Sequence, residues 1–145
     1  MGLVVNSNNV TYQAALAACK SAVEKAESLK INICVSVCDS SGLELAFLRM
    51  NGSYIHSIDI AKNKAYTSAS FKFPSGTWTD IFKEVPHLEQ GFSNRDKLIP
   101  FGGGLPLMLN DEVIGAIGVS GGTEEEDMVC AQAGIDKIIL DQTEK

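Results

Sequence analysis

Apolar residues recur at helical spacing in two long segments, one near each end of the chain. The first segment covers residues 12–29, and the second runs from residue 124 to about residue 141. Thr11 stands where a residue that caps the first helix is expected. Alanine dominates the first apolar stripe, so we expect close packing against a sheet. The predicted core positions are Ala15, Ala18, Cys19, Ala22, Ala26 and Leu29 in the first helix, and Met128, Ala131, Ile135 and Ile138 in the last.

Two other segments alternate in the way that β-hairpins do. Residues 33–38 form a predicted strand, residues 39–42 (Asp-Ser-Ser-Gly) a turn, and residues 43–50 a return strand. The second predicted hairpin joins residues 105–109 to residues 112–119 through Asn110-Asp111. Its last strand is a nearly continuous apolar run, so we expect that strand to be buried.

The middle of the chain predicts a second long helix from Ser57 to about Phe71, with two stripes. One stripe is apolar, and the other is mixed and could face a cavity or a partner. A short helix is expected over residues 77–83, and residues 84–104 are predicted to be irregular, long enough for a functional flap. The apolar stripe consists of Ile58, Ala61, Ala65 and Ala69, and the mixed stripe of Ser57, Lys64, Thr67 and Phe71.

This order of helices and hairpins predicts a single α+β domain over residues 1–145, with an antiparallel sheet flanked by helices. A Ser-Gly-Gly turn leads from the last strand into the last helix, where Thr123 and Glu126 match a capping box. Backbone N–H groups at such a turn can bind an anion. However, residues 124–126 are all glutamates, which would repel a phosphate, so we interpret the turn as architecture.

Composition excludes several functional classes. The formal net charge is −6 and the sequence pI is about 4.8, which favours neither a nucleic acid nor an anionic membrane as partner. No apolar run approaches the roughly 18 residues that span a membrane. The first residues lack the pattern of a signal peptide. We therefore expect a soluble, cytoplasmic protein.

The four cysteines do not form a recognisable disulfide or metal motif. Cys34 and Cys38 share a strand face but lie about 13 Å apart at the usual strand rise, which is too far for a disulfide. Cys19 and Cys130 stand among alanines in predicted helices, where a thiol packs as a small apolar group. We expect four reduced, structural thiols and no metal site.

Groups with catalytic potential are few. Ser120 stands in a glycine-rich turn that does not match the nucleophile elbow of hydrolases. Arg49, Lys64 and Thr67 could converge on a carboxylate if the second helix lies beside the return strand. Alternatively, Arg49 pairs with Asp127 or Asp39 as an internal brace. Both interpretations remain open at this stage.

Several short motifs occur together and in order along nearly the whole chain. Each motif is weak alone, and their combination is specific. The motifs are Val37–Gly42 (VCDSSG), Arg49–Gly52 (RMNG), Ser57, Ile60-Ala61, Lys64-Ala65, Thr67 and Ala69 in the second helix, Gly102–Pro106 (GGGLP), Gly115–Gly121 (GAIGVSG), Asp127 and Ala131.

In these motifs the chain resembles the GlcG/HbpS-like family, also called DUF336, which includes the C-terminal domain of PduO-type cobalamin adenosyltransferases. The resemblance implies a profilin-like α/β/α sandwich that assembles into dimers or higher homo-oligomers. It also implies that some members bind haem or another tetrapyrrole, and an association with glycolate, glycerol or diol catabolism. Function varies within the family, so membership alone does not fix the chemistry.

The chain departs from the family pattern at the expected haem ligand. Relatives of the PduO type are thought to use a histidine on the first helix, and residues 12–29 contain none. The two histidines of the chain are His56, immediately before Ser57, and His87 in the middle segment. We consider His56 a candidate iron ligand. Asn51 also replaces the acidic residue that usually follows Met50.

Three classes of function follow. The first is a small ligand-binding protein, with haem as the cofactor that the resemblance implies. The second is a small enzyme or accessory protein that acts on a carboxylate or aldehyde, and the third is a non-catalytic oligomeric interaction module. If a ligand site exists, we predict it between the second helix and the loop 102–106, formed by Arg49, His56, Ser57, Lys64, Thr67, Gly103 and Gly104.

Overall fold

The computed structural model describes residues 1–143, which form four antiparallel strands and five helices. The strands lie in one sheet in the order β2-β1-β4-β3, so β2 and β3 are its edges. The predicted α+β class is confirmed. In chain order the elements are α1 (Tyr12–Leu29), β1 (Cys34–Asp39), β2 (Glu44–Arg49), α2 (His56–Phe71), α3 (Thr77–Glu84), α4 (Pro86–Phe92), β3 (Gly104–Leu109), β4 (Glu112–Ser120) and α5 (Glu124–Thr143).

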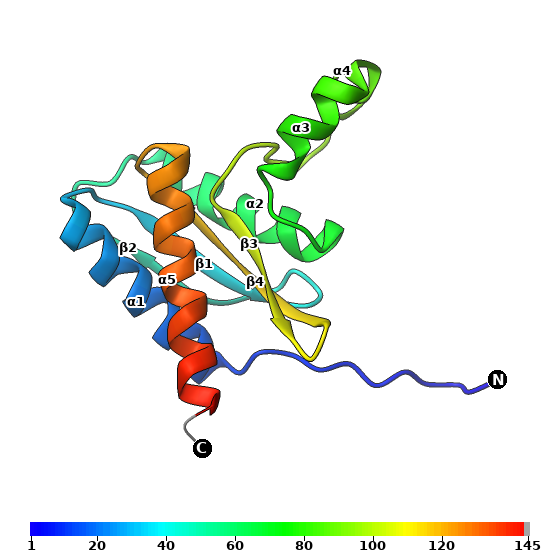
Figure 1. Cartoon of the computed structure of the whole chain (residues 1–145), viewed down its shortest axis with the longest axis horizontal. Coiled ribbons are helices and arrows are strands. Elements are labelled where there is room, and N and C mark those ends of the chain that lie inside the picture. Colours follow the sequence, from blue (N-terminus) through cyan, green and yellow to red (C-terminus); the bar gives the residue numbers. More distant parts are fainter. Residues whose placement is uncertain (144–145) are drawn as a thin grey trace.

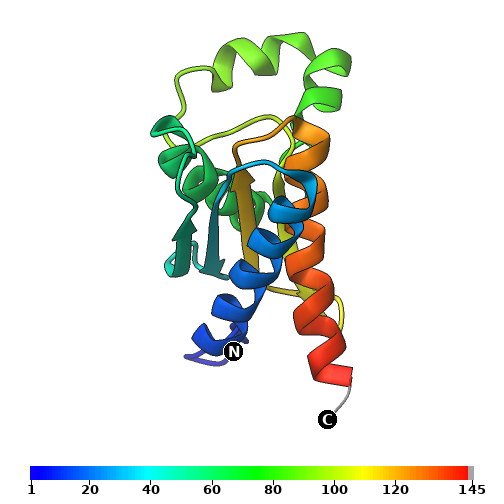
Figure 2. The ribbon, with the colours of Figure 1, turned by 90° about the vertical axis from the view of Figure 1, so that its left-hand side faces the viewer.

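Helices cover both faces of the sheet, as Figures 1 and 2 show. Helices α1 and α5 pack side by side on one face, and α2 covers the other. Val35, Val37 and Ile117 belong to the core beneath α1 and α5. Cys38 and Ala116 pack with alanines of α2. Strand β4 is therefore buried on both faces, as its apolar run predicted.

Small residues let α2 lie very close to the sheet. A Cβ atom on Gly118 would collide with the carbonyl oxygen of Ala61 and would lie 2.5 Å from the amide nitrogen of Ala65. Ala61 and Ala65 are fully buried beneath this strand. The close approach explains why both partners carry side chains of minimal size.

Local signals in the sequence account for most element ends. The Thr11 side chain accepts a hydrogen bond from the amide of Ala14 and caps α1. In the turn after β1, the Asp39 carboxylate accepts hydrogen bonds from the amides of Ser41 and Leu43. Asn110 and Asp111 both have positive φ, 51° and 64°, as a two-residue hairpin turn of this type requires.

The middle segment differs from the prediction, because α4 occupies part of the span expected to be irregular. Helices α3 and α4 form a projection beyond α2, visible in Figure 1. An aromatic cluster holds its base: the ring of Trp78 lies 4.8 Å from that of Phe71 and 4.9 Å from that of Phe92. In α5 the prediction that Met128 is buried is also wrong, since Met128 is 36% exposed. Cys130 and Gly134 instead face the core.

In residues 1–143 no helix is both long enough and apolar enough to cross a membrane.

Candidate functional site

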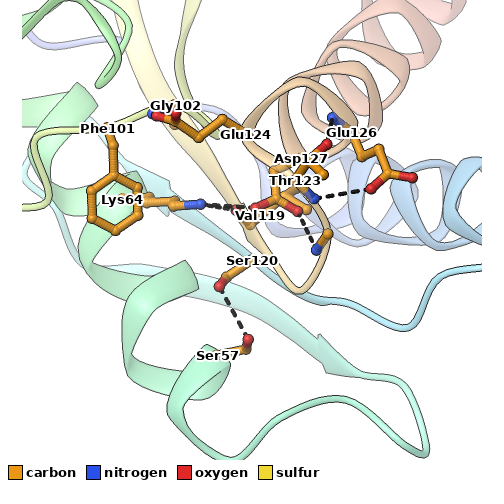
Figure 3. Close-up of polar contacts among 12 residues, drawn as sticks. Ser57, Lys64, Phe101, Gly102, Val119, Ser120, Thr123, Glu124, Glu126 and Asp127 are labelled. Atoms are coloured by element: carbon orange, nitrogen blue, oxygen red, sulfur yellow. Dashed lines mark hydrogen bonds and ion pairs between the residues drawn. The ribbon is translucent and has the colours of Figure 1, made fainter. Parts of the chain in front are cut away.

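The most unusual group in the fold is a buried ion pair between Lys64 of α2 and Asp127 of α5 (Figure 3). The Lys64 Nζ atom lies 3.0 Å from Asp127 Oδ2 and donates a second hydrogen bond of 2.8 Å to the carbonyl of Val119. Lys64 is only 1% exposed and Asp127 only 3%. The pair therefore joins two helices that cover opposite faces of the sheet, at the end of β4.

Burial works against both charges of this pair. Desolvation lowers the pKa of Lys64, and the Asp127 carboxylate opposes that effect by stabilising the ammonium. Desolvation likewise raises the pKa of Asp127, while Lys64 and the amide of Gly122 favour the carboxylate. Each group thus depends on the other for its charge.

The turn before α5 is filled by contacts within the chain. The amide of Gly122 donates to Asp127. The amide of Thr123 donates to Glu126, whose own amide donates to the Thr123 hydroxyl, which completes the capping box (Figure 3). The carboxylate of Glu124 accepts a hydrogen bond from the amide of Gly102. Acidic side chains therefore take the N–H groups that an anion would need, which supports the architectural interpretation of this turn.

Gly103 and Gly104 bring the loop 102–106 directly onto α2. Gly103 has a φ of +126°, and a Cβ atom there would lie 2.5 Å from the Nζ atom of Lys64. A Cβ atom on Gly104 would lie 2.5 Å from the carbonyl oxygen of Lys64 and 2.8 Å from the hydroxyl of Ser68. The space in which we expected a ligand is filled at these positions by the lysine side chain and the loop backbone.

The other polar residues of the mixed stripe on α2 also contact the protein itself. The Ser57 hydroxyl accepts a hydrogen bond of 3.1 Å from Ser120 (Figure 3). The Thr67 hydroxyl donates to the carbonyl of Lys97 and accepts from the amide of Ile99. Both side chains are buried. The stripe therefore faces other segments of the same chain, and it attaches α2 to β4 and to the loop before β3.

Arg49 and His56 lie apart from this buried group. Both are exposed, Arg49 at the end of β2 and His56 at the first residue of α2. The predicted brace between Arg49 and Asp127 or Asp39 is wrong: Asp127 pairs with Lys64, and the Asp39 carboxylate binds its own turn. Arg49 forms no ion pair with the part of the chain that the structure describes.

Large side chains are exposed immediately before His56. Tyr54 is 69% exposed and Ile55 is 83% exposed. We call the four exposed residues Arg49, Tyr54, Ile55 and His56 the α2 entry surface. These residues are close in sequence: Tyr54 and Ile55 directly precede the imidazole of His56, and Arg49 ends the preceding strand, β2.

Two clefts lie along the outer side of α2. One, of about 380 Å³, lies between α2 and residues 95–98 and has Thr67 in its wall. The other, of about 270 Å³, lies between α2 and the β1–β2 hairpin and has Cys38 and Glu44 in its wall. Tyr66 and Lys97 contribute to both clefts, with the Lys97 ammonium 5.0 Å from the centre of the Tyr66 ring. Of the predicted site residues, Thr67 thus borders a cleft.

The cysteines are free and buried, as expected. Burial raises the pKa of the Cys19 and Cys38 thiols to about 12 and that of Cys130 to about 11. Residues 1–143 contain no cluster of three or more His, Cys, Asp or Glu side chains that could hold a metal ion.

These features define an α/β/α sandwich whose polar stripe is internal and in which one exposed histidine, His56, stands at the start of α2. Residues 10–136 match the family described as haem degrading protein HbpS-like. The chain belongs to this HbpS-like family, also called DUF336.

Two proteins with similar sequences come from Citrobacter freundii and Salmonella typhimurium. The chain is 40% identical to an uncharacterised 15.0 kDa protein in the dhaT-dhaS intergenic region of Citrobacter freundii, over 77% of this chain and 81% of that protein. It is 33% identical to the corrinoid adenosyltransferase PduO of Salmonella typhimurium, over 80% of this chain and 35% of PduO. The chain thus spans about a third of PduO.

Solved structures share the fold closely. The protein ORFY of Klebsiella pneumoniae, a DUF336 member, is 33% identical, with a TM-score of 0.89, over 96% of this chain and 97% of that chain. A PduOC:heme complex is 30% identical, with a TM-score of 0.81, over 89% of this chain and 94% of that chain. One structural relative has therefore been solved with haem.

Proposed function

We propose that this protein binds haem or a related tetrapyrrole at the α2 entry surface. The observation that carries the proposal is the exposure of His56 directly beside Tyr54 and Ile55. Exposed aromatic and aliphatic side chains next to an imidazole offer apolar contact and an iron donor at one place on the surface. The family match and the PduOC:heme relative support the same class of ligand.

The residues of this surface fit the chemical groups of haem. The His56 imidazole is a suitable axial donor for iron, and Tyr54 with Ile55 offers apolar contact to the porphyrin. Arg49 has the charge and geometry to hold a propionate. When bound, haem supplies an iron centre for ligand binding or electron transfer. The residues of this chain provide its attachment and orientation.

The buried stripe of α2 has a positioning role in this proposal. Ser57 follows His56 directly, and its hydrogen bond to Ser120 fixes the start of α2 against β4. Lys64 and Thr67 attach the next turns of the helix to α5 and to the loop before β3. Gly103 and Gly104 allow the close approach that these contacts require. We therefore assign ligand contact to Arg49 and His56, and support of α2 to the other five predicted residues.

Haemin titration of the purified protein tests the proposal, followed by the Soret band and its stoichiometry. We expect one haemin per chain and a histidine-type spectrum. His56→Ala should raise the dissociation constant by about tenfold or more and change the Soret maximum. His87→Ala is the matched control, because His87 is the other histidine of the chain and lies in α4.

Arg49 has a matched control as well. Arg49→Ala should weaken haemin binding by up to about fivefold, the range expected for an exposed ion pair, and by less at high salt. Arg95→Ala removes another exposed arginine and should leave the affinity unchanged. Equal spectra and affinities for His56→Ala and the wild type would remove His56 from the site.

Two further expectations from the sequence belong with this proposal. A cytoplasmic location is consistent with four free, buried thiols, because free cysteines are typical of reducing compartments. The association with glycolate, glycerol or diol catabolism stays a prediction.

A further inference from the structure

The segment that precedes α1 forms an extended arm that leaves the fold (Figure 1). Its apolar residues contact almost nothing: Leu3 is 96% exposed, Val4 84% and Val5 93%. Docking of these three consecutive aliphatic side chains on another surface would remove their apolar area from water and would be favourable.

Polar contacts hold the base of the arm and give it a direction. Asn9 accepts a hydrogen bond from the amide of Ser40 in the β1–β2 turn. Asn8 donates to Glu112 at the start of β4, and the hydroxyls of Ser7 and Ser40 lie 3.3 Å apart. The arm therefore crosses the two hairpin turns, and residues 1–5 continue beyond them into solvent.

An apolar groove opens at the base of the same arm. Its volume is about 250 Å³, and it lies between the β3–β4 hairpin and the end of α5. The groove is still open to solvent, since Met108, Leu109 and Ile139 in its wall are 43%, 39% and 45% exposed. The other aliphatic residues in the wall are Val10, Leu107, Ile114, Ile135 and Ile138.

The arm and the groove match in chemistry. Residues 1–9 carry no charged side chain, and the described residues that line the groove are all uncharged. Contact between the two surfaces would therefore bury apolar area without desolvating a charged side chain. Asn9, Thr11, Gln142 and Thr143 stand among the lining residues and can bond the backbone of an extended segment.

We propose that residues 3–5 of one chain dock in this groove of a second copy of the same chain. The arm of a given chain is directed away from its own groove, because Asn9 lies in the groove wall while Ser7 and Asn8 are held at the hairpin turns. Beyond Asn6, five extended residues reach about 17 Å, enough to enter a neighbouring molecule. In a two-fold dimer each arm would cover the groove of its partner, so one symmetric contact buries both arms and both grooves.

Cysteine cross-linking between two separately purified variants tests the proposal. Val4→Cys chains are mixed with size-tagged Ile139→Cys chains under mild oxidation. The native cysteines are all buried and do not compete. We expect a disulfide between tagged and untagged chains. Replacing the second variant with tagged Leu43→Cys, which has an exposed cysteine on the β1–β2 hairpin, should give only background cross-linking.

Light scattering tests the same contact by measuring the mean mass of arm and groove variants. The double variant Leu3→Asp/Val5→Asp, and separately Ile139→Asp, should raise the concentration for half dissociation by about tenfold or more. At low micromolar concentration their mean mass should fall toward 15.5 kDa, the mass of one chain, while Leu43→Asp keeps the wild-type mass. Circular dichroism checks that each variant is folded.

Three results would overturn the proposal. One is the absence of the cross-link between tagged and untagged chains. Another is a cross-link that forms only within a single chain carrying both substitutions. The third is an unchanged mass for both the arm variant and the groove variant. Any of these would assign the groove to the chain's own arm or to a different partner.

Discussion

Replacing Lys64 with methionine should destabilise the fold strongly, because it leaves the Asp127 carboxylate buried without its cation. Both side chains of the pair are almost inaccessible, at 2% and 4% exposure, so water cannot take the place of the ammonium. Removing one partner of a buried pair costs about 3–5 kcal/mol. Since domains of this kind are stable by about 5–15 kcal/mol, Lys64→Met should lose a large share of the free energy of unfolding.

The double variant Lys64→Met/Asp127→Leu should recover much of this loss. It removes both charges and leaves the carbonyl of Val119 and the backbone N–H groups that face Asp127, that of Gly122 above all, without their side-chain partners. Unsatisfied groups of this kind cost about 1–3 kcal/mol. The thermodynamic cycle should therefore give a coupling energy of several kcal/mol between Lys64 and Asp127.

Urea unfolding at one fixed protein concentration measures these values, since self-association would otherwise shift the midpoint. For Lys64→Met we expect the midpoint to fall by about 2 M. The matched control is Lys137→Met, which breaks the half-exposed i,i+4 pair with Asp141. This control should change the stability by no more than about 0.5 kcal/mol. A loss below about 1 kcal/mol for Lys64→Met would refute the buried-pair account.

Three more predictions concern Asp127, Gly118 and the buried cysteines. Asp127→Asn lowers the pKa of Lys64 further by removing its counter-charge. Its loss of stability relative to wild type should be largest near neutral pH, where the wild-type pair is ionised. The loss should shrink as the pH rises toward 10.5, the ordinary lysine value, and also in acid, where the wild-type Asp127, whose pKa is raised, becomes protonated; urea midpoints across pH measure this trend. Gly118→Val should lower the stability by about 1–3 kcal/mol or more, because even a Cβ atom there collides with α2. Gly91→Ala should stabilise α4 slightly, since a Cβ atom on Gly91 meets nothing within 4 Å; thermal melting compares the two variants. In the native protein at pH 8 a thiol reagent should not react with Cys19, Cys38 or Cys130, because burial raises their pKa values to about 12, 12 and 11. The same thiols should react once urea unfolds the chain.

The sequence predicts the fold well where the signal is local. The Thr11 cap, the Asp39 turn and the Asn110-Asp111 turn act within a few residues, and the structure has them in the predicted places. Helix α4 was missed because it has only seven residues and includes Gly91. Its Phe92 packs against Phe71 and Trp78, which precede it by more than ten residues, so local preference does not reveal the helix.

The candidate site shows the same limit. Helical spacing correctly grouped Ser57, Lys64 and Thr67 on one stripe of α2. The partner of Lys64 lies 63 residues further along the chain, and only the closure of the sheet brings Asp127 to it. No local pattern distinguishes a lysine that binds a ligand from a lysine that binds a distant aspartate. The exposure of Tyr54 and Ile55 likewise emerges only from the folded structure.

The central claim is that the α2 entry surface contacts the ligand while the buried stripe supports the fold. The haemin dissociation constant, corrected to the folded fraction and compared among wild type, His56→Ala and Lys64→Met, tests this division most directly. The account predicts a rise of about tenfold or more for His56→Ala and an unchanged value for folded Lys64→Met. A rise for Lys64→Met together with a wild-type value for His56→Ala would contradict it.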